Sequence, residues 1–533
     1  MQKVLVANRG EIALRVFRAA RRLGLGTVGV VAPDDAGSLH ARSADEVVEI
    51  RSYLDPDEHI RAAKLAGADA VHPGYGFLAE NGDFAEAVEA AGLIWIGPPP
   101  DALRAGGDKL AAKRIAAEAG VPTIPEAVEP PLIVKAAAGG GGRGMRVVRS
   151  RAELDDAVDA ARREAQAAFG DDRIYLERYL ERPRHIEIQL LADAHGTVLA
   201  LGERDCSVQR RHQKVLEETP SPALDAELRA RMSDAAVRFA RAIGYVGAGT
   251  AEFVLEGREF FFLELNGRIQ VEHAVTEAVT GVDLVQWQLR IARGEPLELA
   301  SNTVLQAHAV EARLYAEDPL TFLPQAGRIE RLRLPSSIRV DAGVEQGDEV
   351  GTSYDPLIAK LIATGATRDE ALDRLAAALA ETEVGGVITN LPFLRWLVVH
   401  PVFRSGEATT AFLVEYPPLS QPPAAPADPV WRGAFRLNLP APAPQPAPDV
   451  DATAHAHGPA EESSTITAPM PGTVIKVNVR AGSTVKARDP LVVLEAMKME
   501  TPLVSPYDAT VRAVHVREGD RVAGGAVLVE LDD

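Results

Sequence analysis

The sequence predicts a multidomain protein in which α/β and α+β parts precede a small all-β domain. At the amino end, residues 3–8 form an apolar run, residues 12–23 repeat apolar side chains at helical spacing, and residues 27–32 form a second run. Strand, helix and strand in that order open a parallel sheet. At the carboxyl end, residues 472–485 are repeated by residues 509–522 at a constant offset of 37. Two similar halves with alternating apolar positions predict a pseudo-twofold β sandwich.

Length and composition narrow the class of protein. A chain of 533 residues should hold three or four domains. Its 57 basic and 76 acidic residues give a net charge of −19, which argues against a nucleic acid partner. Cys206 is the single cysteine, no signal peptide precedes the first strand, and no apolar run could span a bilayer. We therefore expect a cytoplasmic protein that binds neither nucleic acid nor membrane.

A lysine in the carboxyl-terminal domain, Lys498, lies between two methionines at the turn joining two strand-like runs. A turn with methionine on both sides of a lysine indicates a surface that another protein recognises. Together with the repeat, Ala496-Met-Lys-Met resembles the modification motif of biotinyl carrier domains. The resemblance implies biotin attached covalently to Lys498 by a biotin protein ligase. An ordinary exposed lysine is one alternative; a lipoyl carrier, which has the same fold, is another that the flanking methionines disfavour.

A glycine-rich stretch indicates a nucleotide site. A strand ending at Lys135 leads into residues 139–144, of which five are glycine. Exposed glycine amides can cover phosphates like a lid, although a plain flexible linker is the alternative. No Gly-Lys-Ser/Thr follows, and the first strand–helix turn lacks G-x-G-x-x-G, so neither a Walker loop nor a dinucleotide site is expected. The pattern resembles the ATP-grasp fold, with Gly140, Gly141 and Gly142 in the lid and Lys109 and Lys135 on the phosphates.

An acidic hairpin follows. Pairing Leu255 with Glu259 across a three-residue loop, 256–258, places Glu252 opposite Phe262. Strand parity then puts three oxygen donors on one face: Glu252, Glu264 and Asn266. Such donors suit Mg²⁺ (or Mn²⁺) bridging ATP phosphates. The same alternation continues through Arg268, Gln270 and Glu272, which predicts either a metal site leading into an anion site or an amphipathic edge strand.

Two long motifs, Asn8-Arg-Gly-Glu-Ile-Ala-Leu-Arg15 and His72-Pro-Gly-Tyr-Gly-Phe-Leu-Ala-Glu-Asn81, resemble the amino-terminal domain of biotin carboxylases. The resemblance implies a biotin carboxylase with an ATP-grasp fold, followed by a biotinyl (lipoyl-like) carrier domain. The implied divisions are an amino-terminal domain at 1–108, an ATP-grasp domain at 109–300, a carboxyl-terminal domain at 301–416, a Pro/Ala-rich linker at 417–463 and the carrier at 464–533.

The same resemblance implies roles for individual residues. Lys214, Arg268 and the Val271 backbone would meet bicarbonate, Gln270 would lie beside biotin, and Glu272 would be the base. Arg339 would steady the biotin enolate. The implied nucleotide contacts are Glu177, Leu180, His185, Gln209 and His212. From the residues alone, a structural histidine at 185 and a solvated loop over 203–215 remain alternatives.

The chain departs from the family in two places. Only residues 126–130 separate Pro125 from the strand that ends at Lys135, where biotin carboxylases usually carry a longer segment with a helix. We expect the fold to survive, with a stiffer or displaced lid hinge. Within the linker, residues 430–438 resemble the start of the domain that contacts the carboxyltransferase in longer subunits, without the barrel that should follow.

The expected function is therefore ATP-dependent carboxylation of protein-bound biotin by bicarbonate, through carboxyphosphate. The expected partners are a separate carboxyltransferase (beta) subunit acting on acetyl-, propionyl- or another acyl-CoA, and a second copy of the carboxylase part within a larger hetero-oligomer. Two alternatives are a subunit of a pyruvate or 2-oxo-acid carboxylase, and a catalytically impaired biotin carrier scaffold.

Overall fold

The computed structural model describes residues 1–137, 145–210, 213–299, 307–420, 465–469, 472–496, 499–522 and 525–532. Among these residues, every helix is too short or too polar to cross a membrane. Lys498, His212, Gly140, Gly141, Gly142 and residues 421–463 of the expected linker lie outside the described ranges.

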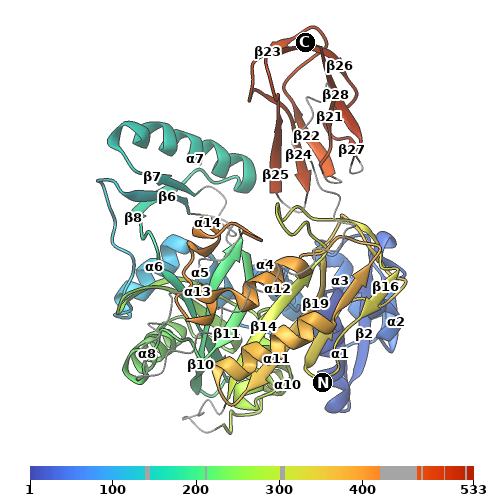
Figure 1. Cartoon of the computed structure of the whole chain (residues 1–533). Helices are drawn as coiled ribbons and strands as arrows, with labels where there is room; N and C mark the ends of the chain where they lie inside the picture. The colour runs from blue at the N-terminus through green and yellow to red at the C-terminus, as the bar shows by residue number, and fades with distance from the viewer. Residues whose placement is uncertain are drawn as a thin grey trace, which may run out of the picture.

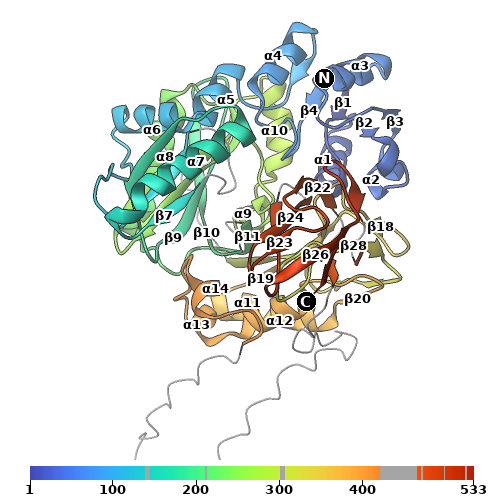
Figure 2. The same cartoon turned by 90° about the horizontal axis from the view of Figure 1, so that it is seen from above.

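The amino-terminal part is the expected α/β unit. Its five strands are parallel and lie in the order β3-β2-β1-β4-β5, so the predicted strand–helix–strand opening is confirmed. Figure 2 shows it at the upper right, in blue. Its elements are β1 (Lys3–Val6), α1 (Gly10–Arg22), β2 (Gly26–Val31), a 3₁₀ turn (Pro33–Asp35), α2 (Leu39–Ser43), β3 (Glu46–Glu49), α3 (Pro56–Leu65), β4 (Ala70–His72), α4 (Gly82–Ala90), β5 (Ile94–Trp95) and α5 (Pro100–Gly107).

A small sheet in the order β7-β6-β8 follows, covered by one long helix, α7; Figure 1 shows it beside the main body at the upper left. Its core is formed by five buried residues, among them Leu132, Val134 and Val148. The short segment before it pairs with β8, because Glu126 bridges Glu177. The elements here are α6 (Lys109–Glu118), β6 (Leu132–Ala136), β7 (Arg146–Val148), a 3₁₀ turn (Arg151–Glu153), α7 (Leu154–Phe169) and β8 (Ile174–Arg178).

The centre of the molecule is one antiparallel eight-stranded sheet, ordered β13-β12-β9-β10-β11-β14-β19-β17. Strands from residues 184–266 and from residues 308–365 are therefore hydrogen-bonded into one surface. Its first part comprises β9 (Arg184–Ala192), β10 (Val198–Arg210), β11 (Gln213–Thr219), α8 (Ala226–Ala242), β12 (Gly247–Glu256), β13 (Glu259–Asn266), α9 (His273–Thr280) and α10 (Leu284–Ala292).

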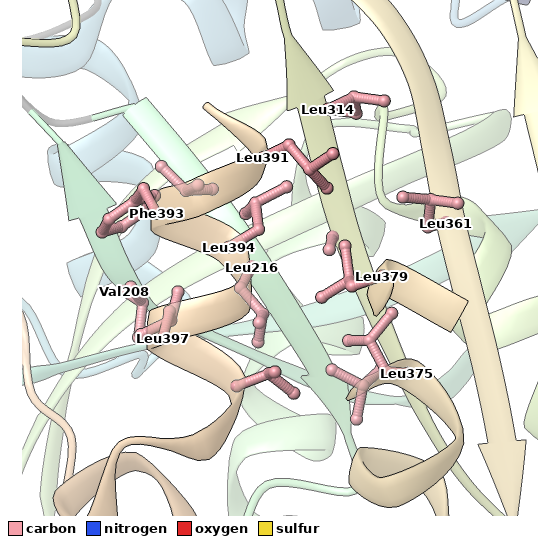
Figure 3. Packing of buried hydrophobic residues seen from close by; sticks show 14 of the residues in the cluster. Val208, Leu216, Leu314, Leu361, Leu375, Leu379, Leu391, Phe393, Leu394 and Leu397 are labelled. Carbon is pink, nitrogen blue, oxygen red and sulfur yellow. The ribbon is translucent and has the colours of Figure 1, made fainter. Parts of the chain in front are cut away.

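The later part of the sheet is backed by a helical layer. Leu375 and Leu379 of α11 and Leu394 and Leu397 of α12 pack over the strands (Figure 3). The elements are β14 (His308–Tyr315), β15 (Gly327–Arg328), β16 (Arg331–Arg333), β17 (Arg339–Ala342), β18 (Glu349–Val350), β19 (Leu357–Gly365), α11 (Arg368–Glu381), β20 (Glu383–Gly385), α12 (Leu391–Val399), α13 (Pro401–Arg404) and α14 (Phe412–Glu415).

The carboxyl-terminal part is the predicted β sandwich of two four-stranded sheets, β21-β28-β26-β23 and β25-β24-β22-β27. The pairs Gly472–Val522 and Val485–Ala509 are equivalent under the 37-residue offset. The short strand of each half therefore pairs with a longer strand of the other half. The strands are β21 (Thr465–Thr467), β22 (Gly472–Val477), β23 (Thr484–Val485), β24 (Pro490–Ala496), β25 (Met499–Val504), β26 (Ala509–Val514), β27 (Arg521–Val522) and β28 (Val527–Asp532). Residue 498 falls between β24 and β25.

The expected register of the acidic hairpin is wrong. Glu256 pairs with Glu259 across a two-residue turn, and Gly257 there has a φ of +61°. A register shift between Glu252 and Phe253 then makes Leu263 an extra residue, a β-bulge, so that Glu252 pairs directly with Glu264. The bulge cancels the effect of the shorter turn on parity, which keeps both carboxylates on one face.

The alternative of an amphipathic edge strand continuing to Glu272 is not what the structure shows. β13 ends at Asn266, and residues 267–272 form a turn that leads into α9. Ile269, Gln270 and Glu272 are all buried in this turn, which we call the base loop (residues 267–272). The alternation of polar and apolar residues therefore did not distinguish a strand from a folded turn.

Candidate functional site

One buried ammonium group organises the centre of the site. Lys214, on β11, donates to Glu252 at 2.7 Å and to Glu272 at 2.8 Å, and it also contacts Glu187. Its side chain is 12% exposed, and the three carboxylates are 6% exposed or less. Burial alone would lower the pKa of Lys214, but the three carboxylates outweigh it and raise that pKa well above its usual range. Lys214 is therefore a fixed cation in this arrangement.

The expected metal ligands lie beside this cation. Glu252 accepts from Asn266 at 2.8 Å and meets His185 at 2.9 Å. Glu264 has a looser partner, the Lys109 ammonium at 3.8 Å. Burial, followed by the charge of Glu252, raises the pKa of the Glu264 carboxyl. Two facing carboxylates next to an amide oxygen form an all-oxygen donor set, and a divalent cation would relieve their repulsion, so these residues fit Mg²⁺.

A second group of ligand atoms, from His185, Glu187 and Glu252, lies within 4.8 Å. Glu187 and Glu252 already bind Lys214, so a cation there would have to displace that ammonium. Glu252 is common to both sites, but Glu264 makes no described contact with Lys214 and has Lys109 only at 3.8 Å, so the facing pair Glu252 and Glu264 is the better metal site.

The base loop places Glu272 against two cations. Its Oε1 accepts from Lys214 at 2.8 Å and its Oε2 from Arg313 at 3.0 Å. Burial favours the neutral acid, but Lys214 and then Arg313 outweigh it and hold the pKa of Glu272 below its usual range. The neighbouring Gln270 donates to Glu252 at 2.9 Å, and Arg268 donates to Asn266 at 3.0 Å. Glu272 is therefore an ionised carboxylate joined to the metal-ligand candidates through one network.

The expected nucleotide residues form a second cluster. Glu177 lies between two lysines and accepts from Lys135 at 2.7 Å and from Lys113 at 2.9 Å. Leu180 is buried in a small apolar cluster with Ile124 and Val254. His185 and Gln209 are 2.8 Å apart.

Lys109 is the first residue of α6, and the Asp108 carboxylate caps that helix by accepting from the amides of residues 110 and 111. A helix amino end with an adjacent lysine favours phosphate. A cavity of about 380 Å³ opens here, lined by Lys109, Glu264, Asn266 and Arg268 among others.

Arg339 stands apart from this network. It donates to Glu277 and to Asp341, each at 2.8 Å, and no described contact joins it to Glu272. Glu277 also binds Arg15 at 2.7 Å, so Arg339 belongs to a charged cluster between α1, α9 and β17.

Sequence patterns did not indicate several members of the site: Glu187, Arg204, Arg313 and Lys113. Glu187 and Arg204 are fully buried and paired with each other. One signal was available. In β9, polar His185, Glu187 and Gln189 alternate with apolar residues along a strand that is buried on both faces, and such a polar row needs partners inside the protein.

The fold and the site are those of an ATP-grasp protein whose chain also carries a domain of the biotinyl type. Family models match in series: "Biotin carboxylase, N-terminal domain" at residues 1–103, "Carbamoyl-phosphate synthase L chain, ATP binding domain" at 108–300, "Biotin carboxylase C-terminal domain" at 311–415 and "Biotin-requiring enzyme" at 464–531. The chain belongs to the biotin carboxylase family, in the form that bears its biotinyl domain on the same polypeptide.

Relatives agree with this membership. The biotin carboxylase of Halalkalibacterium halodurans is 47% identical, over 78% of this chain and 98% of that protein. The biotin-dependent acyl-coenzyme A carboxylase alpha3 subunit of Mycobacterium leprae is 42% identical, over 99% of this chain and 98% of that protein. Methylcrotonoyl-CoA carboxylase subunit alpha of Dictyostelium discoideum is 48% identical over 80% of this chain, which spans only 65% of that relative.

Among solved structures, the biotin carboxylase domain of Hydrogenobacter thermophilus 2-oxoglutarate carboxylase is similar. It has a TM-score of 0.76 and 43% identity, over 78% of this chain and 98% of that one. Its ligands are MgADP, ADP and bicarbonate. Biotin carboxylase of Campylobacter jejuni has a TM-score of 0.76 and 39% sequence identity, over 78% of this chain and 99% of that one.

Proposed function

We propose that this chain uses MgATP to activate bicarbonate and transfers the carboxyl group to biotin held on Lys498. The observation that carries the proposal is that one buried ammonium, Lys214, contacts both the base candidate Glu272 and the metal-ligand candidate Glu252. Activation of bicarbonate needs a base, a cation for the phosphates and a positive anion site within one small volume. The MgADP and bicarbonate in the Hydrogenobacter thermophilus structure support the same ligands here.

In this proposal each residue has a defined task. Lys109 and Lys135 hold ATP phosphates, while Glu252, Glu264 and Asn266 would hold Mg²⁺, which supplies charge neutralisation to phosphoryl transfer. Glu177, Leu180, His185 and Gln209 line the nucleotide, with His212 and the glycines at 140–142 also assigned to it. Lys214, Arg268 and the Val271 amide bind bicarbonate, and Gln270 and Arg339 face biotin. Biotin accepts and carries the carboxyl group.

The low pKa of Glu272 fits this sequence of events. A carboxylate held by two cations is ionised but weakly basic. When bicarbonate binds Lys214, the ammonium is shared with the new anion, so the pKa of Glu272 rises toward that of a useful base. Bicarbonate thereby prepares the group that removes its proton.

The test is ATP hydrolysis by the purified chain. We expect phosphate release to require bicarbonate and Mg²⁺ and to increase when free biotin is added. Chelation of the divalent cation should abolish it. Hydrolysis that is indifferent to both bicarbonate and biotin would contradict the proposal and favour a catalytically impaired carrier scaffold.

The carboxyl acceptor is an acyl-CoA in this proposal, reached on a separate carboxyltransferase beta subunit. Support comes from the Mycobacterium leprae relative, which is named for acyl-CoA and matches along nearly its whole length. Some similar structures come from 2-oxoglutarate and pyruvate carboxylases, so a 2-oxo acid is the second candidate. A screen of acceptors with the copurified partner distinguishes the two.

Three further assignments belong to the same proposal. Pairing of the carboxylase part with a second copy is supported by the dimer of the Hydrogenobacter thermophilus domain. A cytoplasmic location is supported by the single, buried Cys206, while several relatives are named mitochondrial. A biotin protein ligase would modify Lys498.

Biotin should appear on Lys498 when the chain is produced with a biotin protein ligase. The physical reason is that β24 ends at Ala496 and its paired strand β25 begins at Met499, so residue 498 belongs to the connection between two strands and to neither of them. Intact-mass analysis should show one adduct, and Lys498→Arg should lose it, with Lys486→Arg on the same domain as the matched control. An adduct that survives Lys498→Arg would place biotin elsewhere.

A further inference from the structure

Two motifs noted in the sequence, Asn8–Glu11 and His72–Asn81, have no task in the reaction so far. In the structure they are joined. The Asn8 amide donates to the carbonyls of Pro73 and Tyr75, each at 2.7 Å, and the Tyr75 hydroxyl contacts Glu11. Glu11 is 4% exposed, so this assembly holds a buried carboxylate at the start of α1.

The partner of that carboxylate is a lysine from the far end of the central sheet. Lys360, on β19, is fully buried, and its ammonium lies 3.2 Å from Glu11. The same ammonium donates to the carbonyl of Val271 at 2.8 Å. Lys360 therefore connects the amino-terminal unit to the base loop.

A second cation reaches the loop from the neighbouring strand. Arg313 of β14 pairs in register with Lys360 of β19, and it donates to Glu272 at 3.0 Å. Adjacent cations thus hold two consecutive loop residues, Arg313 through a side chain and Lys360 through the backbone. The Val271 carbonyl and the Glu272 amide belong to one peptide plane, so fixing this carbonyl sets the direction in which Glu272 leaves the loop.

Stability alone does not explain a lysine here. A buried ion pair contributes little net stability compared with well-packed apolar residues, because desolvation offsets its attraction. Two other acids lie near Lys360. Glu311 is fully buried without a hydrogen-bond partner among the described residues, and Asp341, which pairs in register with Lys360, already binds Arg339 and Arg18. In the described part of the chain, the contacts of the Lys360 ammonium are those to Glu11 and to the loop carbonyl.

We propose that Lys360 is a positioning residue for bicarbonate activation: it holds the Val271–Glu272 peptide in place, with Glu11 and Tyr75 holding Lys360. The inference rests on the proposed function, in which the Val271 amide binds bicarbonate and Glu272 removes its proton. It gives the two amino-terminal motifs a role in aligning the base rather than in binding a nucleotide.

The test compares Lys360→Met with a matched control, Arg368→Met. Arg368 is also a largely buried cation of the carboxyl-terminal part, but it pairs with Glu218, outside the base loop. For Lys360→Met we expect kcat/KM for bicarbonate to fall about 100-fold, as small misplacements of a catalytic group do, while the dissociation constant of MgATP stays within about threefold. Arg368→Met should leave kcat/KM for bicarbonate within about threefold of the parent chain.

A double variant separates positioning from folding. Lys360→Met leaves Glu11 as an unpaired buried charge, and adding Glu11→Gln removes that penalty. The double variant should recover thermal stability without recovering kcat/KM for bicarbonate. Recovery of both together would overturn the inference and reduce Lys360 to a structural partner of Glu11.

Amide hydrogen exchange tests the same inference without turnover. Lys360→Met should speed exchange in residues 267–273 at least tenfold relative to the parent chain, and Arg368→Met should not. Unchanged exchange in this segment would overturn the proposed anchor. An inactive parent chain with the expected exchange pattern would contradict the proposed function while supporting the anchor.

Discussion

Replacing Glu272 by glutamine is expected to lower bicarbonate-dependent ATP hydrolysis by about 10²–10⁴-fold, the usual cost of losing a general base. Glutamine keeps the size of the side chain but neither accepts the proton nor balances Lys214 and Arg313. Equilibrium binding of MgATP should change little, because Glu272 lies outside the Glu177 cluster. Steady-state rates with saturating bicarbonate, together with nucleotide titration, measure both quantities.

Glu264→Gln is the matched comparison for this experiment. It removes a carboxylate from the metal-ligand candidates and leaves the base in place, so the KM for MgATP should rise more than kcat falls. A Glu272→Gln rate within about threefold of the parent would assign proton removal to another group.

Removal of the central ammonium should have the largest effect on stability. Lys214→Met leaves Glu187, Glu252 and Glu272 without their shared cation in a buried volume, and breaking such a pair typically costs about 3–5 kcal/mol. Urea unfolding followed by tryptophan fluorescence reports this loss, since Trp95, Trp287 and Trp396 are buried in the main body. Turnover should be lost as well, because the proposed bicarbonate site loses its cation.

The loss of unfolding free energy in Lys214→Met should become smaller as the pH falls. In the parent chain the pKa values of Glu252 and Glu272 lie below those of the unfolded chain, so both carboxylates stabilise the fold above about pH 4.3. Without Lys214 these carboxyls protonate more readily, so the deficit should be largest near pH 8 and should narrow toward about pH 4. Lys113→Met, whose ammonium binds the single carboxylate Glu177, is the control. A deficit that grows on acidification would contradict this account.

The sequence predicted the parts of the site that depend on local order. The strand–helix–strand opening and the two-sheet sandwich follow from periodicity and the internal repeat, and the structure confirms them. The shared face of Glu252 and Glu264 is confirmed too, although it depends on a bulge that offsets the wrongly predicted loop length. Motif resemblance added roles for Lys109, Lys135 and Glu272, which stay predictions until tested.

The remaining features depend on contacts between distant segments. No turn signal in the hairpin sequence indicates the bulge at Leu263. Counting loop residues could therefore not predict the register of the two strands. Arg313 and Lys360 lie 41 and 89 residues from the loop positions that they bind. Lys360 is the one charged residue of β19, whereas Arg313 shares β14 with Glu311. Local patterns do not indicate which distant backbone such a charge will meet.

Arg313 and Lys360 lie late in the chain, which has a consequence for the folding of the protein during its synthesis. A growing chain folds domain by domain from its amino end. The lysines of the nucleotide cluster and Glu272 itself emerge from the ribosome before Arg313 and Lys360 do, since β14 and β19 follow them in the chain. A nascent chain can therefore shape a nucleotide pocket while the base is still unanchored. With the proposed roles of Glu272 and Lys360, activation of bicarbonate would therefore wait until β14 and β19 have joined the central sheet, after the nucleotide residues have been made.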